Sequence, residues 1–156
     1  MLICSAAAAL DAPNERVMLT VDGHISTTNS GEQALFDRAM LANLDWRTIE
    51  TYTSFTEGLN RFSGPTIASL LEAVGAQGAK LRAVAADDYA VTISIADAKK
   101  HGAILAMEHN GQQMGIRNKG PIWIVYPQSK AEAEAHTYYV QMIWQLVRIE
   151  VLAQAG

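Results

Sequence analysis

Cysteine is almost absent from this chain, with Cys4 the only one among 156 residues. A single thiol cannot form an internal disulfide or a site with several cysteine ligands. The four histidines are His24, His101, His109 and His136, and none has the HxxxH spacing of a metal-binding helix. The sequence therefore predicts no disulfide framework and no metal site built from histidine and cysteine.

Clustered charge and long apolar runs are also missing. The formal net charge is -4 and no basic block occurs, so nucleic acid, which binds clustered Lys and Arg, is not expected as a partner. No apolar run approaches the roughly 20 residues of a membrane-spanning helix, so no span is expected. The chain also lacks a P-loop, a GxGxxG turn, a GxSxG elbow and HExxH.

The N-terminal residues 2–13 read LICSAAAALDAP, with apolar residues followed by small ones. This order is typical of the end of a secretory signal near its cleavage site, although the basic start of such a signal is missing. The alternative is an N-terminal arm. We expect residues 1–13 to be a leader or residual signal segment, residues 14–156 to form one domain, and the protein to be periplasmic.

Apolar residues make up 49% of the chain, which is enough to bury a core. Strand-like and helix-like patterns mix without a repeating βαβ unit, and this predicts an α+β fold with mixed sheets and short flanking helices. Strands are expected at 17–21, 48–53, 80–86, 90–93, 103–108, 112–115, 122–126 and 144–152.

Helix signals occur at four places. The capping-box form of residues 30–33 predicts a helix that carries Leu35, Phe36, Ala39, Met40 and Leu44 on one face. A second helix is expected to have Pro65 in its first turn and to end at Gly75. A third follows Ser94 and ends at Gly102, and a helical turn is expected at 131–135.

Asn110-Gly111 predicts a tight hairpin, because both residues accept positive φ. The three tryptophans are interpreted as packing residues, with Trp123 and Trp144 in the core and Trp46 against the first helix.

Three segments carry a resemblance to a known family: DYAVTIS at 88–94, AMEHNG at 106–111 and NKGP at 118–121. In this order and spacing, over about residues 17–151, they resemble the molybdopterin-binding domain of the sulfite oxidase superfamily. The resemblance implies that these segments are a strand with cofactor contacts, a structural hairpin and a loop over the pterin.

The sequence departs from this family at two positions. The family holds molybdenum through a cysteine at the end of an earlier strand, but the matching segment 49–55 reads IETYTSF, and the cysteine position falls near Thr53. The basic residue expected before the late tryptophan is Ile143. The first change removes a thiolate ligand. The second removes a charge that would suit the phosphate of molybdopterin, which a free pterin lacks.

Candidate ligand residues follow from the chemistry of a pterin, which presents an amino group beside a ring N–H. A carboxylate accepts both hydrogen bonds in a two-pronged geometry, and Asp87 and Asp88 are the candidates. Phe55 and Tyr89 are candidates for stacking on the ring. The alternatives are a solvated turn for the two carboxylates and ordinary core packing for Phe55.

Two further groups of candidates are polar. Arg117, Asn118, Lys119 and Gly120 form a loop that offers side-chain and backbone donors, although such loops are often only solvated turns. The hydroxyl groups of the segment before Phe55 are expected on the opposite wall: Thr51, Thr53 and Ser54.

The chain is also similar to small periplasmic pterin-binding proteins that pass ligand occupancy to membrane-bound cyclic-di-GMP enzymes. This similarity implies a non-catalytic pterin-binding protein whose partner is the periplasmic domain of a diguanylate cyclase or phosphodiesterase. A free pterin is the expected ligand. One alternative is a molybdopterin-dependent oxidoreductase with Tyr52, Thr53 or Ser54 as the molybdenum anchor. Another is an interaction domain with a vestigial pocket.

Overall fold

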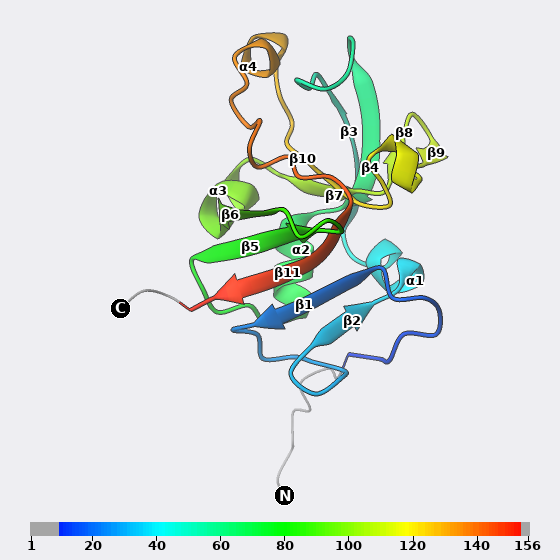
Figure 1. Ribbon diagram of the computed structural model, residues 1–156, viewed down its shortest axis with the longest axis vertical. Helices are drawn as coiled ribbons and strands as arrows, with labels where there is room; N and C mark the ends of the chain where they lie inside the picture. Colours follow the sequence, from blue (N-terminus) through cyan, green and yellow to red (C-terminus); the bar gives the residue numbers. More distant parts are fainter. Residues whose placement is uncertain (1–9, 154–156) are drawn as a thin grey trace, which may run out of the picture.

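A mixed five-stranded sheet forms the lower half of the molecule in the computed structural model, which describes residues 10–153 (Figure 1). Its strands, in spatial order, are β2 (Ala34–Phe36), β1 (Leu19–Gly23), β11 (Leu146–Leu152), β5 (Lys80–Ala85) and β6 (Ala90–Ser94). β1 and β11 run parallel, and the other neighbours are antiparallel. The last strand of the chain therefore occupies the middle of the sheet.

Two smaller sheets stand above it. One has the order β3 (Trp46–Thr51), β4 (Asn60–Pro65), β8 (Glu108–His109) and β9 (Gln112–Gln113), and the other pairs β10 (Trp123–Val125) with β7 (Ile104–Ala106). A bridge between Thr66 and Ile104 links them. β7 and β10 are buried along their whole length, so the core extends from the large sheet into this region.

The helices are short: α1 (Arg38–Ala42), α2 (Ile67–Ala73), α3 (Ile95–Lys100), the 3-10 turn η1 (Ile116–Asn118) and α4 (Lys130–Glu134). α2 lies behind the five-stranded sheet in Figure 1 and buries Ile67, Leu70 and Leu71. No helix within residues 10–153 has the length and apolar character needed to cross a membrane.

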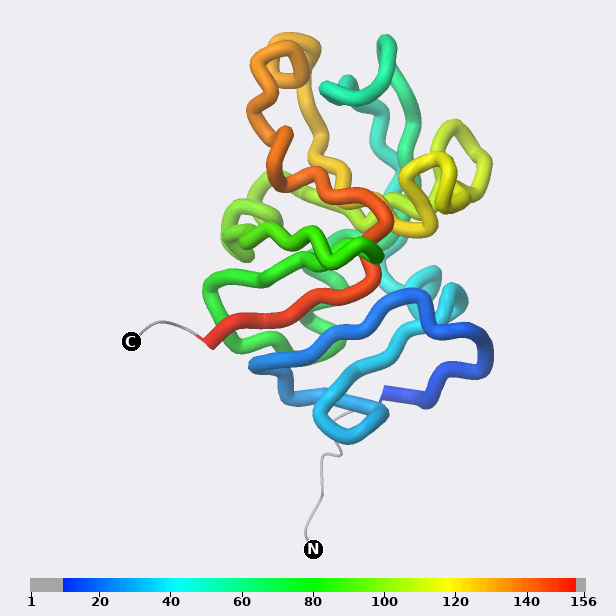
Figure 2. Tube along the Cα trace, viewed as in Figure 1, coloured from blue at the N-terminus to red at the C-terminus, as the bar shows by residue number. Residues whose placement is uncertain are grey.

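Two arms project upward from this body. One is the turn between β3 and β4, and the other is the segment of about residues 127–142 that contains α4 (Figure 2). Hydrogen bonds join them, because the Ser54 hydroxyl donates to the Ala133 carbonyl at 2.7 Å and the Gln128 backbone N–H donates to Thr51 Oγ1 at 2.6 Å. The arms are thus held together at their bases and along their facing sides.

Much of the expected architecture is confirmed, including the α+β class. α2 ends at Ala73, and Gly75, which follows the C-cap Val74, has a φ of 61°. The N–H groups of Gly75 and Ala76 close the helix on the carbonyls of Glu72 and Leu71. Ser94 caps α3 by accepting from the Asp97 N–H. Asn110 and Gly111 both have positive φ in the β8–β9 turn.

The first predicted helix is wrong in position. Leu35 and Phe36 belong to β2, and the helix begins only at Arg38, with Asp37 as its N-cap. Ser30 and Gln33 form an isolated bridge in a turn. The edge of β1 must find hydrogen-bond partners, and β2 supplies them, so sheet pairing overrides the helical spacing of the apolar residues.

Two other expectations also need correction, and a third lies largely outside the described residues. Pro65 is the last residue of β4, a strand that the sequence patterns missed, so it does not lie in the first turn of α2, which Thr66 caps. Trp144 precedes β11 and is 39% exposed, so it is not a core residue, whereas Trp123 is buried as expected. The predicted leader lies largely outside the described residues, as does Cys4.

Asp37 offers a test of the fold, because its buried carboxylate joins the N-terminal segment to α1. It accepts hydrogen bonds from the backbone N–H groups of Met40 at 2.9 Å, Asn14 at 2.8 Å and Glu15 at 3.2 Å. These bonds, that of Met40 most of all, hold the pKa of Asp37 below its ordinary value, although burial opposes them. Because the folded-state pKa is lowered, the stabilisation is present above the unfolded-state pKa of about 3.9 and is lost as the pH falls through the folded value.

We therefore expect Asp37→Asn to lower the urea midpoint at pH 7. The difference from wild type should narrow as the pH falls below the unfolded-state pKa of about 3.9, because the wild-type carboxylate then becomes protonated. Urea titrations followed by circular dichroism at pH 7 and at successively lower pH would measure it. A difference that stays constant with pH would show that the charge of Asp37 contributes nothing.

Candidate functional site

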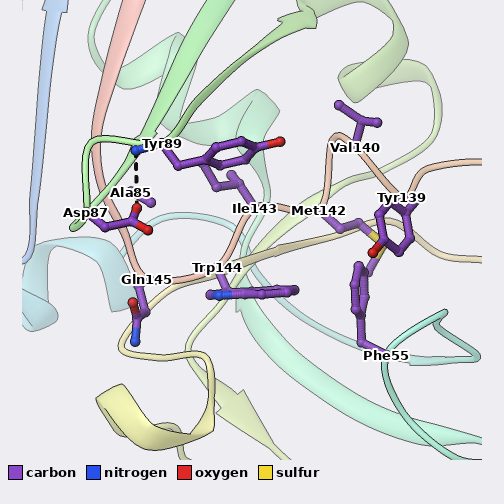
Figure 3. A pocket seen from close by; sticks show the side chains of 10 residues that line it. All are labelled: Phe55, Ala85, Asp87, Tyr89, Tyr139, Val140, Met142, Ile143, Trp144 and Gln145. Carbon is purple, nitrogen blue, oxygen red and sulfur yellow. Dashed lines mark hydrogen bonds between the residues drawn. The ribbon is translucent and has the colours of Figure 1, made fainter.

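An aromatic cavity of about 270 Å³ lies between the β5–β6 turn and the segment that leads into β11. This volume is close to the lower end of the range for small-ligand pockets, about 300–1,000 Å³. Figure 3 shows Tyr89 and Trp144 on opposite sides of the space, with Phe55 and Tyr139 at one end and Asp87 and Gln145 at the other. The lining is completed by Ala85, Val140, Met142 and Ile143.

Phe55 organises the rings at one end of the cavity. It stacks on Tyr139, with ring centres 4.8 Å apart. It also forms T-shaped contacts with Trp144 and Trp123, whose ring centres lie 5.0 Å and 6.0 Å from its own. Edge-to-face and offset contacts of this kind stabilise a fixed arrangement of rings. Tyr89 and Tyr139 are 56% and 50% exposed, so aromatic surface is open to a planar ligand.

A free acceptor lies at the other end. Asp87 Oδ1 accepts from the backbone N–H of Tyr89 at 3.1 Å, which fixes the carboxylate (Figure 3). Oδ2 accepts no hydrogen bond from a described residue. Asp88, by contrast, occupies the left-handed region with φ 70° and does not line this cavity. Asp87 and Asp88 were equivalent candidates from the sequence, but only Asp87 lines the cavity.

A second, polar cavity of about 210 Å³ lies beside the first. Arg117, Asn118 and Lys119 line it, together with His109 and Trp123. Partial burial lowers the pKa of His109, and the positive charge of Lys119 adds to this effect. Arg117 and Lys119 form no ion pair within residues 10–153, so this cavity favours an anionic or hydroxylated group.

Lys119 connects the two cavities. Its Nζ lies 5.5 Å from the ring centre of Trp144 and 5.7 Å from that of Trp123, within the range of a cation–π contact. Trp144 lines the aromatic cavity and Trp123 the polar one. A ligand with a flat ring and a polar tail could therefore contact both cavities around this side chain.

Gly120 belongs to the same loop, but its place is set by backbone packing. A Cβ at this position would lie 2.1 Å from the Met114 carbonyl oxygen. The Gly120 N–H donates to the Gly115 carbonyl at 2.8 Å. The absence of a side chain at Gly120 thus allows the loop to close on Met114.

The hydroxyl groups near the family's cysteine position are already used within the protein. Thr51 Oγ1 lies 3.1 Å from the Gln128 carbonyl, and Ser54 bonds to Ala133 as described above. Thr53 Oγ1 accepts from the Phe55 N–H at 3.0 Å and lies 2.7 Å from Thr56 Oγ1. Thr53 and Ser54 line a third cavity beneath α4 rather than the aromatic one.

The structure therefore divides the sequence candidates into groups. Phe55, Asp87 and Tyr89 line the aromatic cavity together, and Arg117, Asn118 and Lys119 line its polar neighbour. Thr51, Asp88 and Gly120 line neither. Whether each of them contacts a ligand stays a prediction.

Sequence reasoning did not single out Tyr139, Met142 or Gln145, and it placed Trp144 in the core. The reason is that Trp144 and Gln145 were taken as the start of a strand. A polar residue directly after a tryptophan was the available signal that this stretch leaves the sheet. Its meaning appears only in the fold, where Gln145 has a φ of 52°.

The residues around Thr53 do not fit a thiolate-held molybdenum. Residues 10–153 contain no cysteine, and no group of three or more His, Asp or Glu side chains in this range could hold a metal ion. The nearby hydroxyls already have hydrogen-bond partners. Open aromatic faces and a fixed carboxylate do fit the ring of a pterin.

Comparison with known proteins agrees with this fold. Residues 19–153 match the family described as the oxidoreductase molybdopterin binding domain. A similar solved structure is the sulfane dehydrogenase SoxCD from Paracoccus pantotrophus, with a TM-score of 0.67 and 14% sequence identity over 92% of this chain. The chain spans only 40% of that protein's chain, and at this identity the likeness concerns the fold. No curated protein matches the sequence.

Gly120 and Gly115 provide a matched test of the loop. We expect Gly120→Ala to lower the free energy of unfolding by at least about 2 kcal/mol, because the added Cβ collides with backbone. Gly115 has an ordinary φ of -88° and open space around its Cβ position, so Gly115→Ala should change stability by no more than about 0.5 kcal/mol. Urea denaturation of both variants tests this, and equal effects would contradict the packing of the loop on Met114.

Proposed function

Because the chain belongs to the oxidoreductase molybdopterin-binding domain family, we propose that it binds a pterin, and that it does so as a non-catalytic protein. The observation that carries this proposal is the cavity in which the Trp144 indole, the Tyr89 ring and the Asp87 carboxylate meet. A pterin ring would stack on aromatic surface and present its amino group and ring N–H to Asp87.

The proposed ligand is a free pterin rather than the complete molybdenum cofactor. Two features support this choice. The hydroxyls at the anchoring position are engaged with Phe55, Thr56 and Ala133, and an apolar Ile143 lines the cavity where the family has a basic residue. Arg117 and Lys119 would contact the polar side chain of the pterin from the neighbouring cavity.

We further propose that the protein is a periplasmic sensor. Its partner would be the periplasmic domain of a membrane-bound diguanylate cyclase or phosphodiesterase, which would respond to pterin occupancy. The support is the resemblance to small periplasmic pterin-binding regulators, together with a binding cavity that lacks a metal anchor and so needs a use other than redox catalysis.

A molybdopterin-dependent oxidoreductase is the second candidate, since the family is named for that chemistry. It would require an oxygen ligand from Tyr52, Thr53 or Ser54. Thr53 or Ser54 would have to give up hydrogen bonds that now hold the β3–β4 arm in place.

The composition of the bound ligand separates these two candidates. We expect protein purified from a host that makes molybdenum cofactor to release a pterin and to contain molybdenum far below one atom per chain. Mass spectrometry of the released ligand and elemental analysis of the same sample would measure both. Stoichiometric molybdenum with molybdopterin would favour the oxidoreductase instead.

The placement of the ring can be tested with paired carboxylate variants. We expect Asp87→Asn to weaken the binding of pterin (2-amino-4-oxopteridine) by about 10-fold or more, because it removes a charge-assisted hydrogen bond worth about 1.5–3 kcal/mol. Asp88→Asn should change the affinity much less, because Asp88 does not line the cavity. Fluorescence titration would give the dissociation constants. A larger loss with Asp88→Asn would contradict the assignment.

The stacking surface can be tested separately. Trp144→Ala should weaken pterin binding by about 5-fold or more, since a stacked base contributes about 1–3 kcal/mol. Val140→Ala is the matched control, because Val140 lies at the rim and is 59% exposed. Equal affinities of the wild type and Trp144→Ala, measured by calorimetry, would place the ring elsewhere.

A further inference from the structure

Gln145 lies at the boundary between the aromatic cavity and an outer groove. Among the described residues it alone lines both spaces, and its backbone has a φ of 52°. The groove, of about 470 Å³, is lined by exposed apolar side chains that include Val17, Ile116 and Val147. A change in the position of Gln145 can therefore alter both the aromatic cavity and the outer groove.

The side-chain amide of Gln145 has a fixed orientation. Its Nε2 donates to the Ile116 carbonyl at 2.8 Å. The opposite orientation would place two oxygen acceptors against each other, so Nε2 must face the loop. Oε1 then points away from that loop and, in Figure 3, lies on the side of Asp87. No described residue donates a hydrogen bond to Oε1.

The backbone of Gln145 joins two loops. Its N–H donates to the Lys119 carbonyl at 3.0 Å, and its carbonyl accepts from the Ala86 N–H at 2.9 Å. The first bond, together with the bond from Nε2 to the Ile116 carbonyl, holds the segment 115–120. The second holds the turn that carries Asp87. One residue thus fixes the position of the polar loop relative to the acceptor end of the cavity.

We propose that Gln145 is a second ligand acceptor, which acts beside Asp87 and selects rings with a donor-rich edge. Because the same amide holds Ile116, ligand contact at Oε1 also restrains the segment 115–120 at the outer groove. This inference rests on the proposed pterin binding, and it adds both a specificity residue and the route by which occupancy reaches the surface.

The selectivity can be tested with two ring systems that differ at one group. Pterin has an amino group at C2, and lumazine has a carbonyl there, which would face the acceptors Asp87 and Gln145. We expect the wild type to prefer pterin over lumazine. Gln145→Leu should reduce this preference by about 3- to 10-fold, because it removes a neutral hydrogen bond worth about 0.5–1.5 kcal/mol. Gln145→Glu keeps an acceptor and should keep most of the preference.

The coupling can be followed by hydrogen exchange of the backbone amides of residues 115–120. Pterin should slow their exchange in the wild type. The effect should be lost in Gln145→Leu and in Gln145→Glu, since neither variant can donate to the Ile116 carbonyl. Gln77→Leu is the matched control, because Gln77 is exposed and lines none of the cavities described here. It should behave as the wild type in both experiments.

The two proposals fail in different ways. If the wild type binds neither pterin nor lumazine, the proposed function is overturned. If it binds pterin with an affinity ratio to lumazine that Gln145→Leu leaves unchanged, the acceptor role of Gln145 is wrong while pterin binding stands. If exchange at 115–120 does not respond to pterin in the wild type, the coupling is wrong.

Discussion

The position of β11 between β1 and β5 is the constraint on which the site depends. The last strand enters the middle of the large sheet, and Arg148 of β11 binds Asp22 of β1 through two hydrogen bonds of 3.0 and 3.1 Å. The antiparallel pairing of β11 with β5, in which Leu146 lies opposite Ala85, places the residues just before β11 beside the end of β5. Trp144 and Gln145 thereby meet the turn that carries Asp87, although more than 50 residues separate them in the sequence.

Local signals in the sequence predicted the elements whose ends are fixed by a capping or turn residue nearby in the chain. Gly75, Ser94 and the Asn110-Gly111 turn act within a few residues, and each is found where it was expected. The first helix failed because the choice between helix and strand for Leu35 and Phe36 depends on β1, a distant partner. Of the predicted ligand residues, Phe55, Asp87 and Tyr89 line the aromatic cavity. They were predicted from the chemistry of the ligand and the family resemblance. Gln145 also lines the cavity and was not predicted, because its hydrogen bonds to two loops are recorded by no short pattern.

Near Thr53, where the family resemblance implies a molybdenum ligand, the side chains instead stabilise the β3–β4 turn. A thiolate at this place would have to stay free of internal hydrogen bonds in order to bind a metal. Thr53 and Ser54 instead use their hydroxyls to fix the β3–β4 turn and to hold the opposite arm at Ala133. Placing a cysteine at Thr53 would therefore remove two hydrogen bonds while adding a thiolate, so one substitution alone would not create a metal site.

Phe55 connects the hydrogen-bonded residues Thr53 and Ser54 to the cavity. It follows Ser54 directly, and its ring contacts Tyr139 of one arm and Trp144 at the cavity wall. A planar ligand that stacks on Trp144 must pack beside Phe55, and any displacement of Phe55 would act on Tyr139. In the proposed complex, the arms would meet the ligand through Phe55 and the outer groove would meet it through Gln145, at opposite ends of the cavity. A partner that contacts either region would be sensitive to occupancy without touching the pterin itself.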